Sequence, residues 1–215
     1  MSNAHQVAIV TGASRGIGAG LVAGYRRLGF RVVATSRSIA PSNDERVLAI
    51  AGDIRDRTTA QKLVAAAKER FGRIDTLVNN AGIFIAKPFL EYTQEDFDAV
   101  TATNVTGLFH ITQAVLAELL ARQSGHVVNI TASLVDQPLA SVPAGLAALT
   151  KGGLNGWVRA YRRRRTPVAW TTQIERYSSR ADRAASERVS SWTPTHPAPR
   201  CTFATFTFGR SFVCR

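Results

Sequence analysis

Short apolar runs alternate with longer amphipathic segments along the first 158 residues of the chain. The short runs are rich in β-branched residues, which is typical of buried parallel strands, whereas the longer segments repeat apolar residues at helical spacing. The predicted strands are Gln6–Thr11, Phe30–Ala34, Val47–Ala51, Ile74–Val78 and Val127–Ile130. The predicted helices are Gly16–Leu28, Thr58–Phe71, Thr93–Arg122 and Ala144–Ala160. This alternation predicts an α/β fold with a doubly wound parallel sheet between two layers of helices.

The pattern changes after Ala160. Residues 159–215 contain no Leu and no Lys, and they begin with the run Arg162–Arg165 in a segment rich in Ser, Thr, Arg and Pro. Such a composition does not easily bury a core. We therefore expect a domain over residues 1–158, an atypical and frameshifted or disordered basic tail over 159–215, and a sheet that lacks its C-terminal strands.

The 215 residues include 27 Lys and Arg against 15 Asp and Glu, a net charge of +12 that would ordinarily suggest nucleic acid or an anionic membrane as partner. Residues 1–158 carry only +3 of this charge, and the tail carries +9. The chain shows no apolar run of the roughly 18 residues that a membrane helix needs and no basic start followed by an apolar stretch. We expect a cytoplasmic protein with no membrane or specific nucleic-acid partner.

A glycine-rich turn follows the first predicted strand, with Gly12, Gly16 and Gly18 in the stretch Thr11–Gly18. Gly12 permits a tight turn, while Gly16 and Gly18 let the backbone and the following helix approach a pyrophosphate. Taken alone, the turn is also compatible with a structural role and no ligand.

The glycine spacing, together with the stretch Asn79–Gly82 after the fourth predicted strand, resembles the short-chain dehydrogenase/reductase family over about residues 6–158. The resemblance implies a Rossmann-like fold that binds a nicotinamide dinucleotide and acts on a carbonyl or an alcohol. It also implies that Asp53 contacts the adenine, that Asn104 joins a proton relay and that Lys151 binds the nicotinamide ribose. The candidate cofactor-binding residues are Gly12, Ser14, Arg15, Gly16, Ile17, Gly18, Arg37, Asp53, Ile54, Asn80, Ala81, Gly82 and Lys151, and no metal site is expected.

The second predicted strand ends in Ala34-Thr35-Ser36-Arg37, without the carboxylate that usually binds the ribose 2′-hydroxyl of NAD. Arg15 and Arg37 offer forked donors that suit a 2′-phosphate. The cofactor is therefore expected to be NADP(H) rather than NAD(H), unless both arginines are ordinary solvated side chains.

The residue that should move the proton differs from the family pattern. In the family a tyrosine stands four residues before the lysine, and Ala147 occupies that position. The candidate catalytic residues are Asn104, Ser133 and Lys151, with Thr131 as the alternative to Ser133. His110 is expected to be a packed helix residue rather than a catalyst. Because alanine cannot exchange a proton, we expect an oxidoreductase homologue that is impaired or inactive, and the alternative is a non-enzymatic NADP(H)-binding or interaction protein.

Three origins of the tail remain open: a shift of reading frame near residues 157–165, a basic nucleic-acid-binding arm, or a divergent subdomain. A frame shift predicts that another frame of the coding DNA encodes a strand followed by Pro-Gly beyond codon 158. The segment Thr202–Phe208 has strand-like spacing and is expected to pair with the sheet edge that a missing sixth strand exposes, or to promote aggregation. The helices at 104–120 and 144–160 are expected to form a homo-oligomer interface.

Overall fold

The computed structural model describes residues 6–139, 141–162, 167–175 and 204–205. The strands are β1 (Val7–Thr11), β2 (Arg31–Ser36), β3 (Val47–Ala51), β4 (Thr76–Asn79), β5 (Gly125–Ala132), β6 (Val168–Glu175) and β7 (Ala204–Thr205). The helices are α1 (Gly16–Arg27), α2 (Arg57–Phe71), α3 (Gln94–Thr101), α4 (Leu108–Ala121), α5 (Ser133–Asp136) and α6 (Gly145–Arg162), with a 3₁₀ turn η1 (Phe89–Glu91) and a π-helical turn η2 (Ala102–Gly107).

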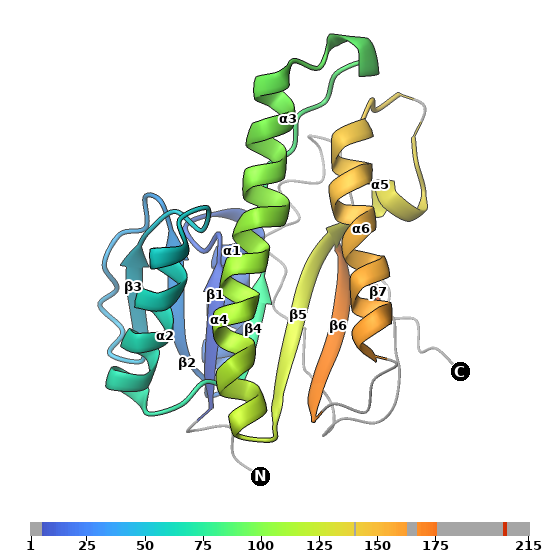
Figure 1. The fold of residues 1–215 in the computed structure, drawn as a ribbon. Coiled ribbons are helices and arrows are strands. Elements are labelled where there is room, and N and C mark those ends of the chain that lie inside the picture. The colour runs from blue at the N-terminus through green and yellow to red at the C-terminus, as the bar shows by residue number, and fades with distance from the viewer. Residues whose placement is uncertain (1–5, 140, 163–166, 176–203, 206–215) are drawn as a thin grey trace.

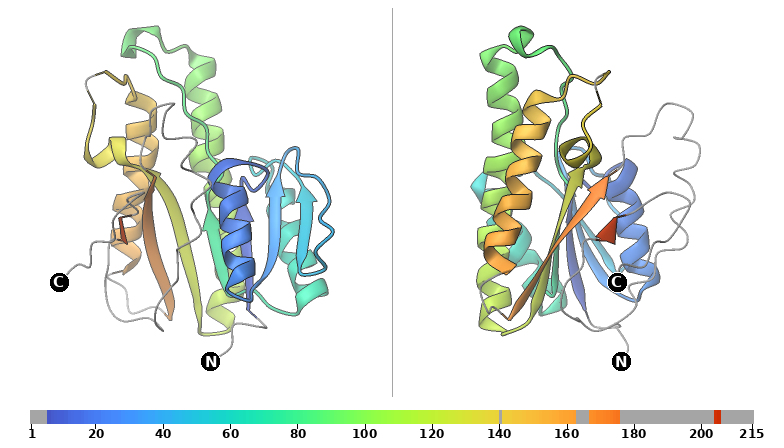
Figure 2. Two further views of the ribbon diagram at one scale, coloured as in Figure 1. Left: turned by 180° about the vertical axis from the view of Figure 1, so that it is seen from behind. Right: turned by 90° about the vertical axis from the view of Figure 1, so that its right-hand side faces the viewer.

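All the strand pairs in the described sheet are parallel, in the order β3-β2-β1-β4-β5-β6-β7. The strand order reverses between β1 and β4, so this is the switch point at which doubly wound sheets bind ligands. Helices α2, α4 and α6 cover one face of the sheet and α1 covers the other (Figures 1 and 2). The predicted fold class is confirmed.

Burial on both faces explains the continuous apolar run in β1. Val7 and Ile9 belong to the core under α2, α4 and α6, whereas Ala8 and Val10 belong to the core under α1. Successive side chains of a strand point to opposite faces, so a strand covered on both sides is apolar at every position.

The segment predicted as a single helix from Thr93 to Arg122 consists of α3, the π-helical turn η2 and α4. Thr93 and Asp96 form the expected capping box at its start. The π turn adds a residue to the helical repeat, as such turns often do at functional sites. Periodicity in the sequence could not show it, because the apolar spacing continues on both sides.

The expectation that the sheet lacks its C-terminal strands is wrong for β6. This eight-residue strand pairs with β5 from Gly125↔Val168 to Ala132↔Glu175. Val168, Trp170 and Thr172 are buried, with Ala169 exposed between them. The prediction counted aliphatic β-branched residues, whereas aromatic and threonine side chains also suit a half-buried strand.

Aromatic packing holds β6 against α6. The Trp170 ring stacks on Tyr161 with centroids 4.9 Å apart, and it meets Trp157 edge to face at 5.3 Å. The two residues of β7 pair with β6 rather than with the edge of β5. Most other residues of the tail, including Cys201, Cys214 and the Arg163–Arg165 part of the arginine run, lie outside the described residues, and the division of the chain at residue 158 stays a prediction.

Candidate cofactor and active site

The turn between β1 and α1 is too closely packed to accept side chains at two of its glycines. Gly12 has a φ of +65°, and a Cβ there would lie 2.8 Å from the Cα of Ala81. A Cβ on Gly18 would lie 2.0 Å from the carbonyl oxygen of Gly12. Helix α1 begins at Gly16 with no acidic residue in its first turn, so its free N–H groups offer a site for an anion.

A polar clamp joins this turn to the end of β4. The Asn80 side-chain amide donates to the carbonyl oxygens of Thr11 at 2.9 Å and Gly12 at 3.1 Å. The Thr11 hydroxyl accepts from the backbone N–H groups of Asn80 and Ala81, both at 3.0 Å, and donates to the Val78 carbonyl oxygen. The clamp fixes the carboxyl ends of β1 and β4 on the two sides of the switch point.

Thr11 was not predicted as a site residue, although a threonine at the end of an otherwise apolar strand could have indicated one.

Asn79, the residue before Asn80, has a different role. Its Nδ2 atom donates to Thr112 and Asn129 in the core, both at 2.9 Å. The two adjacent asparagines therefore separate into a core residue and a residue that borders the site.

Asn104 is almost completely buried in the π-helical turn, with 2% of its surface exposed. Its Oδ1 atom accepts from the Ile83 N–H at 2.9 Å, and its Nδ2 atom donates to the Ile83 carbonyl oxygen at 3.0 Å. The same Nδ2 atom donates to the Thr150 hydroxyl on α6 at 3.3 Å. Asn104 thus binds the segment after β4 to the helix that carries Lys151.

Lys151 reaches from α6 to the end of β5, where Nζ donates to the Ile130 carbonyl oxygen at 2.8 Å. A Cβ on Gly82 would lie 3.2 Å from this Nζ atom and 3.2 Å from the Oδ1 atom of Asn104. The structure therefore brings Asn104 and Lys151, which are 47 positions apart in the chain, to the same glycine.

Ala147 lies one turn before Lys151 on α6 and is 4% exposed. Its methyl group supplies no donor or acceptor. Ser133 is half-buried at the first position of α5, just beyond β5, and Thr131 is fully buried near the end of β5. Both hydroxyl candidates thus lie at the carboxyl end of β5, and the choice between them stays open.

The candidates for the adenosine end lie at the carboxyl ends of β1, β2 and β3. Ser14 and Arg15 are exposed in the glycine turn, Ile17 is half-buried, and Arg37 is exposed just after β2. Ile54 is buried against the π-helical turn, where a Cβ on Gly107 would lie 2.7 Å from its Cγ1 atom.

Asp53 forms an ion pair with Arg55 at 2.6 Å. Hydrogen bonding from the Arg55 side chain, followed by the Arg55 N–H and by the charges of Arg55 and Arg37, lowers the pKa of Asp53 despite some burial. Asp53 is therefore ionised at neutral pH.

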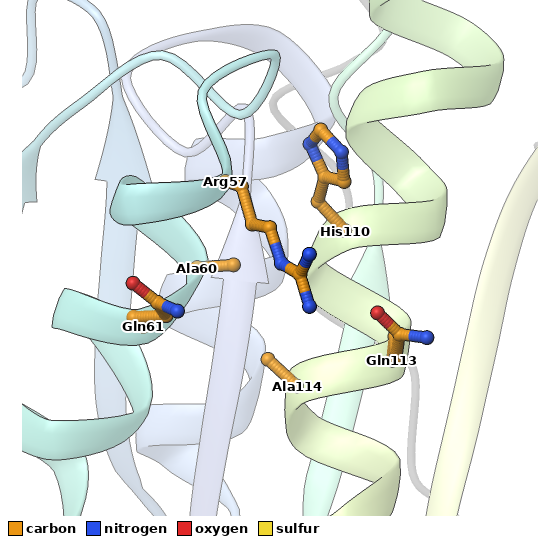
Figure 3. Close-up of a pocket in the computed structure, with 6 residues that line it drawn as sticks. All are labelled: Arg57, Ala60, Gln61, His110, Gln113 and Ala114. Carbon is orange, nitrogen blue, oxygen red and sulfur yellow. The ribbon is translucent and has the colours of Figure 1, made fainter.

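His110 belongs to α4. It lines a pocket of about 240 Å³ between α2 and α4, together with Arg57, Ala60, Gln61, Gln113 and Ala114 (Figure 3). The Arg57 side chain extends from α2 toward α4 in this pocket (Figure 3). Lys151 belongs to α6, on the other side of α4 (Figure 1), and the expectation that His110 is not a catalyst stays a prediction.

The sequence model of the short chain dehydrogenase family matches residues 6–168, which is the region that builds this site. The chain belongs to the short-chain dehydrogenase/reductase family. It is 37% identical over 161 residues to the oxidoreductase UcpA of Salmonella typhimurium, covering 68% of this chain and 61% of the relative. It is also 37% identical over 161 residues to 2,3-dihydroxy-2,3-dihydro-p-cumate dehydrogenase of Pseudomonas putida, covering 70% of this chain and 61% of the relative. The chain thus spans 61% of the length of these curated relatives.

Solved structures of dehydrogenases share the fold. The serine dehydrogenase of Escherichia coli superposes with a TM-score of 0.73 and 26% identity, covering 80% of this chain and 82% of that one. The short-chain dehydrogenase/reductase glucose/ribitol dehydrogenase of Brucella melitensis gives a TM-score of 0.74 at 24% identity over 87% of this chain and 82% of that one. The second likeness supports the fold alone.

The residues present fit the nicotinamide dinucleotide that short-chain dehydrogenases use. Close packing at Gly12 and Gly18 holds the glycine turn against Asn80 and α1, the space beside Gly16 is open, and the first turn of α1 carries no acidic residue. The nicotinamide end would meet Lys151 and Asn104, and the adenosine end would meet Arg37 and Asp53. Among the described residues, no group of three His, Cys, Asp or Glu side chains could hold a metal ion, and no helix there has the length and hydropathy to cross a bilayer.

Proposed function

We propose that this short-chain dehydrogenase homologue binds NADP(H) and transfers hydride to or from a carbonyl or alcohol, with proton transfer that is impaired or lost. The observation that carries the proposal is the convergence of Asn104 and Lys151 on Gly82, beside an alanine where the family has its tyrosine. Binding groups are retained, whereas the acid/base group is replaced.

The preference for NADP(H) rests on charge at the carboxyl end of β2. Arg37 is exposed just after this strand, and Arg15 is exposed in the glycine turn. A guanidinium pairs with phosphate through two parallel N–H bonds, so both arginines suit a 2′-phosphate. NAD(H), which lacks that phosphate, gains nothing from them.

When bound, the dinucleotide supplies or accepts the hydride. The residues of this chain would bind and orient the reactants and transfer the proton. Lys151 is fixed by the Ile130 carbonyl oxygen and would hold the nicotinamide ribose. Asn104 fixes the backbone at Ile83, and Ser133, or alternatively Thr131, would orient the carbonyl. Ala147 can neither give nor take a proton, and losing a positioned acid/base group costs about 10²–10⁴ in rate.

Restoring the phenol tests the proposal. We expect wild type to bind NADPH, seen by the change in nucleotide fluorescence, but to turn over a panel of carbonyl compounds slowly or not at all. Ala147→Tyr is expected to raise turnover about 10²-fold or more. Ala148→Tyr is a matched control, because residue 148 is exposed on the same helix and its phenol would lie outside the site.

Three outcomes separate the alternatives. Strong wild-type turnover contradicts the loss of proton transfer. NADPH binding with no gain in folded Ala147→Tyr favours the second candidate, a non-enzymatic NADP(H)-binding or interaction protein. A wild-type protein that binds no dinucleotide rules out both.

The proposal includes a homo-oligomer built through α4 and α6. Val105, Phe109 and Leu120 of the 104–120 region and Leu149 of α6 are exposed apolar side chains, which supports an interface there. Sedimentation equilibrium measures this association. A cytoplasmic location is part of the proposal. The lack of a specific nucleic-acid partner is also proposed, because residues 1–158 are nearly neutral.

A further inference from the structure

The loop after β3 holds a tight local ion pair. The Oδ2 atom of Asp53 accepts from Nε of Arg55 at 2.9 Å and from Nη2 at 2.6 Å. The Oδ1 atom accepts from the backbone N–H of Arg55 at 3.0 Å. Arg55 therefore engages both oxygens of the carboxylate, although the Asp53 and Arg55 side chains are 29% and 46% exposed.

This pair lies beside the end of β2. Ser36 of β2 is in register with Ala51 of β3, and the Gly52 N–H donates to the Ser36 carbonyl oxygen at 3.1 Å. Arg37 and Asp53 each follow directly on these paired residues. Two guanidiniums and one carboxylate therefore meet at the edge of the sheet where the adenosine would bind.

A free carboxylate at this edge would oppose the binding of a 2′-phosphate, because two negative groups would approach each other. It would not oppose a ribose that carries only hydroxyls. An unpaired charge on Asp53 would thus weaken the binding of NADPH much more than the binding of NADH.

We propose that Arg55 is a specificity-determining residue that neutralises Asp53 and so allows the edge formed by β2 and β3 to accept a phosphate-bearing adenosine. The inference rests on the proposed binding of NADP(H) and adds a residue to it. In this role Arg55 acts on the carboxylate and does not itself bind the phosphate. Asp53 can then remain beside the adenine without repelling the phosphate.

The quantity that tests this role is the ratio of the dissociation constants for NADH and NADPH. Contacts common to both cofactors, such as a contact of Asp53 with adenine, cancel in the ratio. Coulomb repulsion between close charges in a water-like dielectric corresponds to about a fivefold change in affinity. The ratio is best measured at low ionic strength, where screening is weak.

Three variants of the whole chain separate neutralisation from direct contact. Arg55→Gln is expected to lower the ratio about fivefold, because it exposes the Asp53 charge to the phosphate. The double variant Asp53→Asn/Arg55→Gln removes both charges and is expected to restore the wild-type ratio. The control Arg57→Gln loses the same charge from a side chain that extends toward α4 (Figure 3), and it should change the ratio less than about twofold.

An unchanged ratio in folded Arg55→Gln overturns the inference while leaving NADP(H) binding intact. A ratio in the double variant as low as that in Arg55→Gln also overturns the inference, because Arg55 would then contact the phosphate itself. An Arg57→Gln effect equal to that of Arg55→Gln shows only general attraction and contradicts a specific role. If wild type binds neither nucleotide, the proposed function fails and the inference fails with it. Thermal unfolding of each variant verifies that it is folded.

Discussion

The two halves of the sheet differ in how completely they match the sequence pattern of the short-chain dehydrogenases. The half formed by β1, β2 and β3 has the glycine turn, its close packing at Gly12 and Gly18, and the clamp through Asn80. The half formed by β4, β5 and β6 keeps Asn104 and Lys151 in place but has Ala147 where a proton donor is expected. In the proposed function, nucleotide binding and proton transfer therefore depend on separate local structures, so that the first is kept while the second is changed.

The halves also differ in the residue types of their strands. In the first half, the chain from Gln6 to Asp75 contains no histidine, and its strands are largely apolar. In the second half, His126 and Thr171 meet across β5 and β6, and Trp170 is buried at the outer side of β5. The following tests ask whether the second half is packed as firmly as the first.

The largest effect is expected from Trp170→Ala. Trp170 is 5% exposed and packs on Trp157 and Tyr161, so its removal should lower the free energy of unfolding by about 4 kcal/mol. Urea unfolding followed by circular dichroism measures the loss. Trp170→Phe keeps an aromatic ring and is the matched control, with an expected loss of about 1 kcal/mol. Equal stability of Trp170→Ala and wild type would show that β6 adds nothing to the core.

A smaller effect is expected from pH, through His126. Burial lowers the pKa of His126 from 6.5 to about 4, so between these values the unfolded chain binds more protons than the folded one. The contribution of His126 to the free energy of unfolding is therefore fully present above about pH 6.5. It is lost as the pH falls toward 4, and the total loss is about 3 kcal/mol.

Urea unfolding of wild type and His126→Gln at pH 7, 6 and 5 tests this expectation. The difference between the two proteins isolates His126 from the carboxylates, which titrate in both. Wild type should lose more stability than the variant over this range. Parallel pH dependence in the two proteins would contradict a neutral imidazole at His126 in the folded protein.

The smallest effect on stability concerns the first half. Gly18→Ala places a methyl group against the Gly12 carbonyl oxygen, where the Cβ would lie 2.0 Å away. We expect a loss of about 2 kcal/mol in the free energy of unfolding and a loss of NADPH affinity of about tenfold or more, measured by urea unfolding and fluorescence titration.

Gly153→Ala is the control for this substitution, because a Cβ at Gly153 meets nothing within 4 Å. There the gain in helix propensity should stabilise α6 by about 0.5–1 kcal/mol. If Gly18→Ala and Gly153→Ala changed the free energy of unfolding equally, the close packing of α1 against the glycine turn would not restrict the residue at position 18.

The first half was predicted closely. Its strands β1, β2 and β3 differ from the predicted ranges by at most two residues at either end, because each is a short apolar run with clear turn residues beside it. Prediction was poorer in the second half. The π-helical turn does not interrupt the apolar spacing, and β6 consists of residues that composition alone assigned to an irregular tail.

The sequence by itself determined the alternation of strands and helices, the glycine turn and the absence of a phenol at residue 147, because these depend on local spacing and on the identity of single residues. Only the tertiary structure decided which groups meet. The Thr11 hydroxyl binds the N–H of Asn80 from 69 positions away, and Asn104 reaches Thr150 across 46. Such contacts depend on how parallel strands and their covering helices pack, and no local pattern encodes that packing. The same packing placed β6 in the sheet, where a buried tryptophan compensates for a shortage of aliphatic residues.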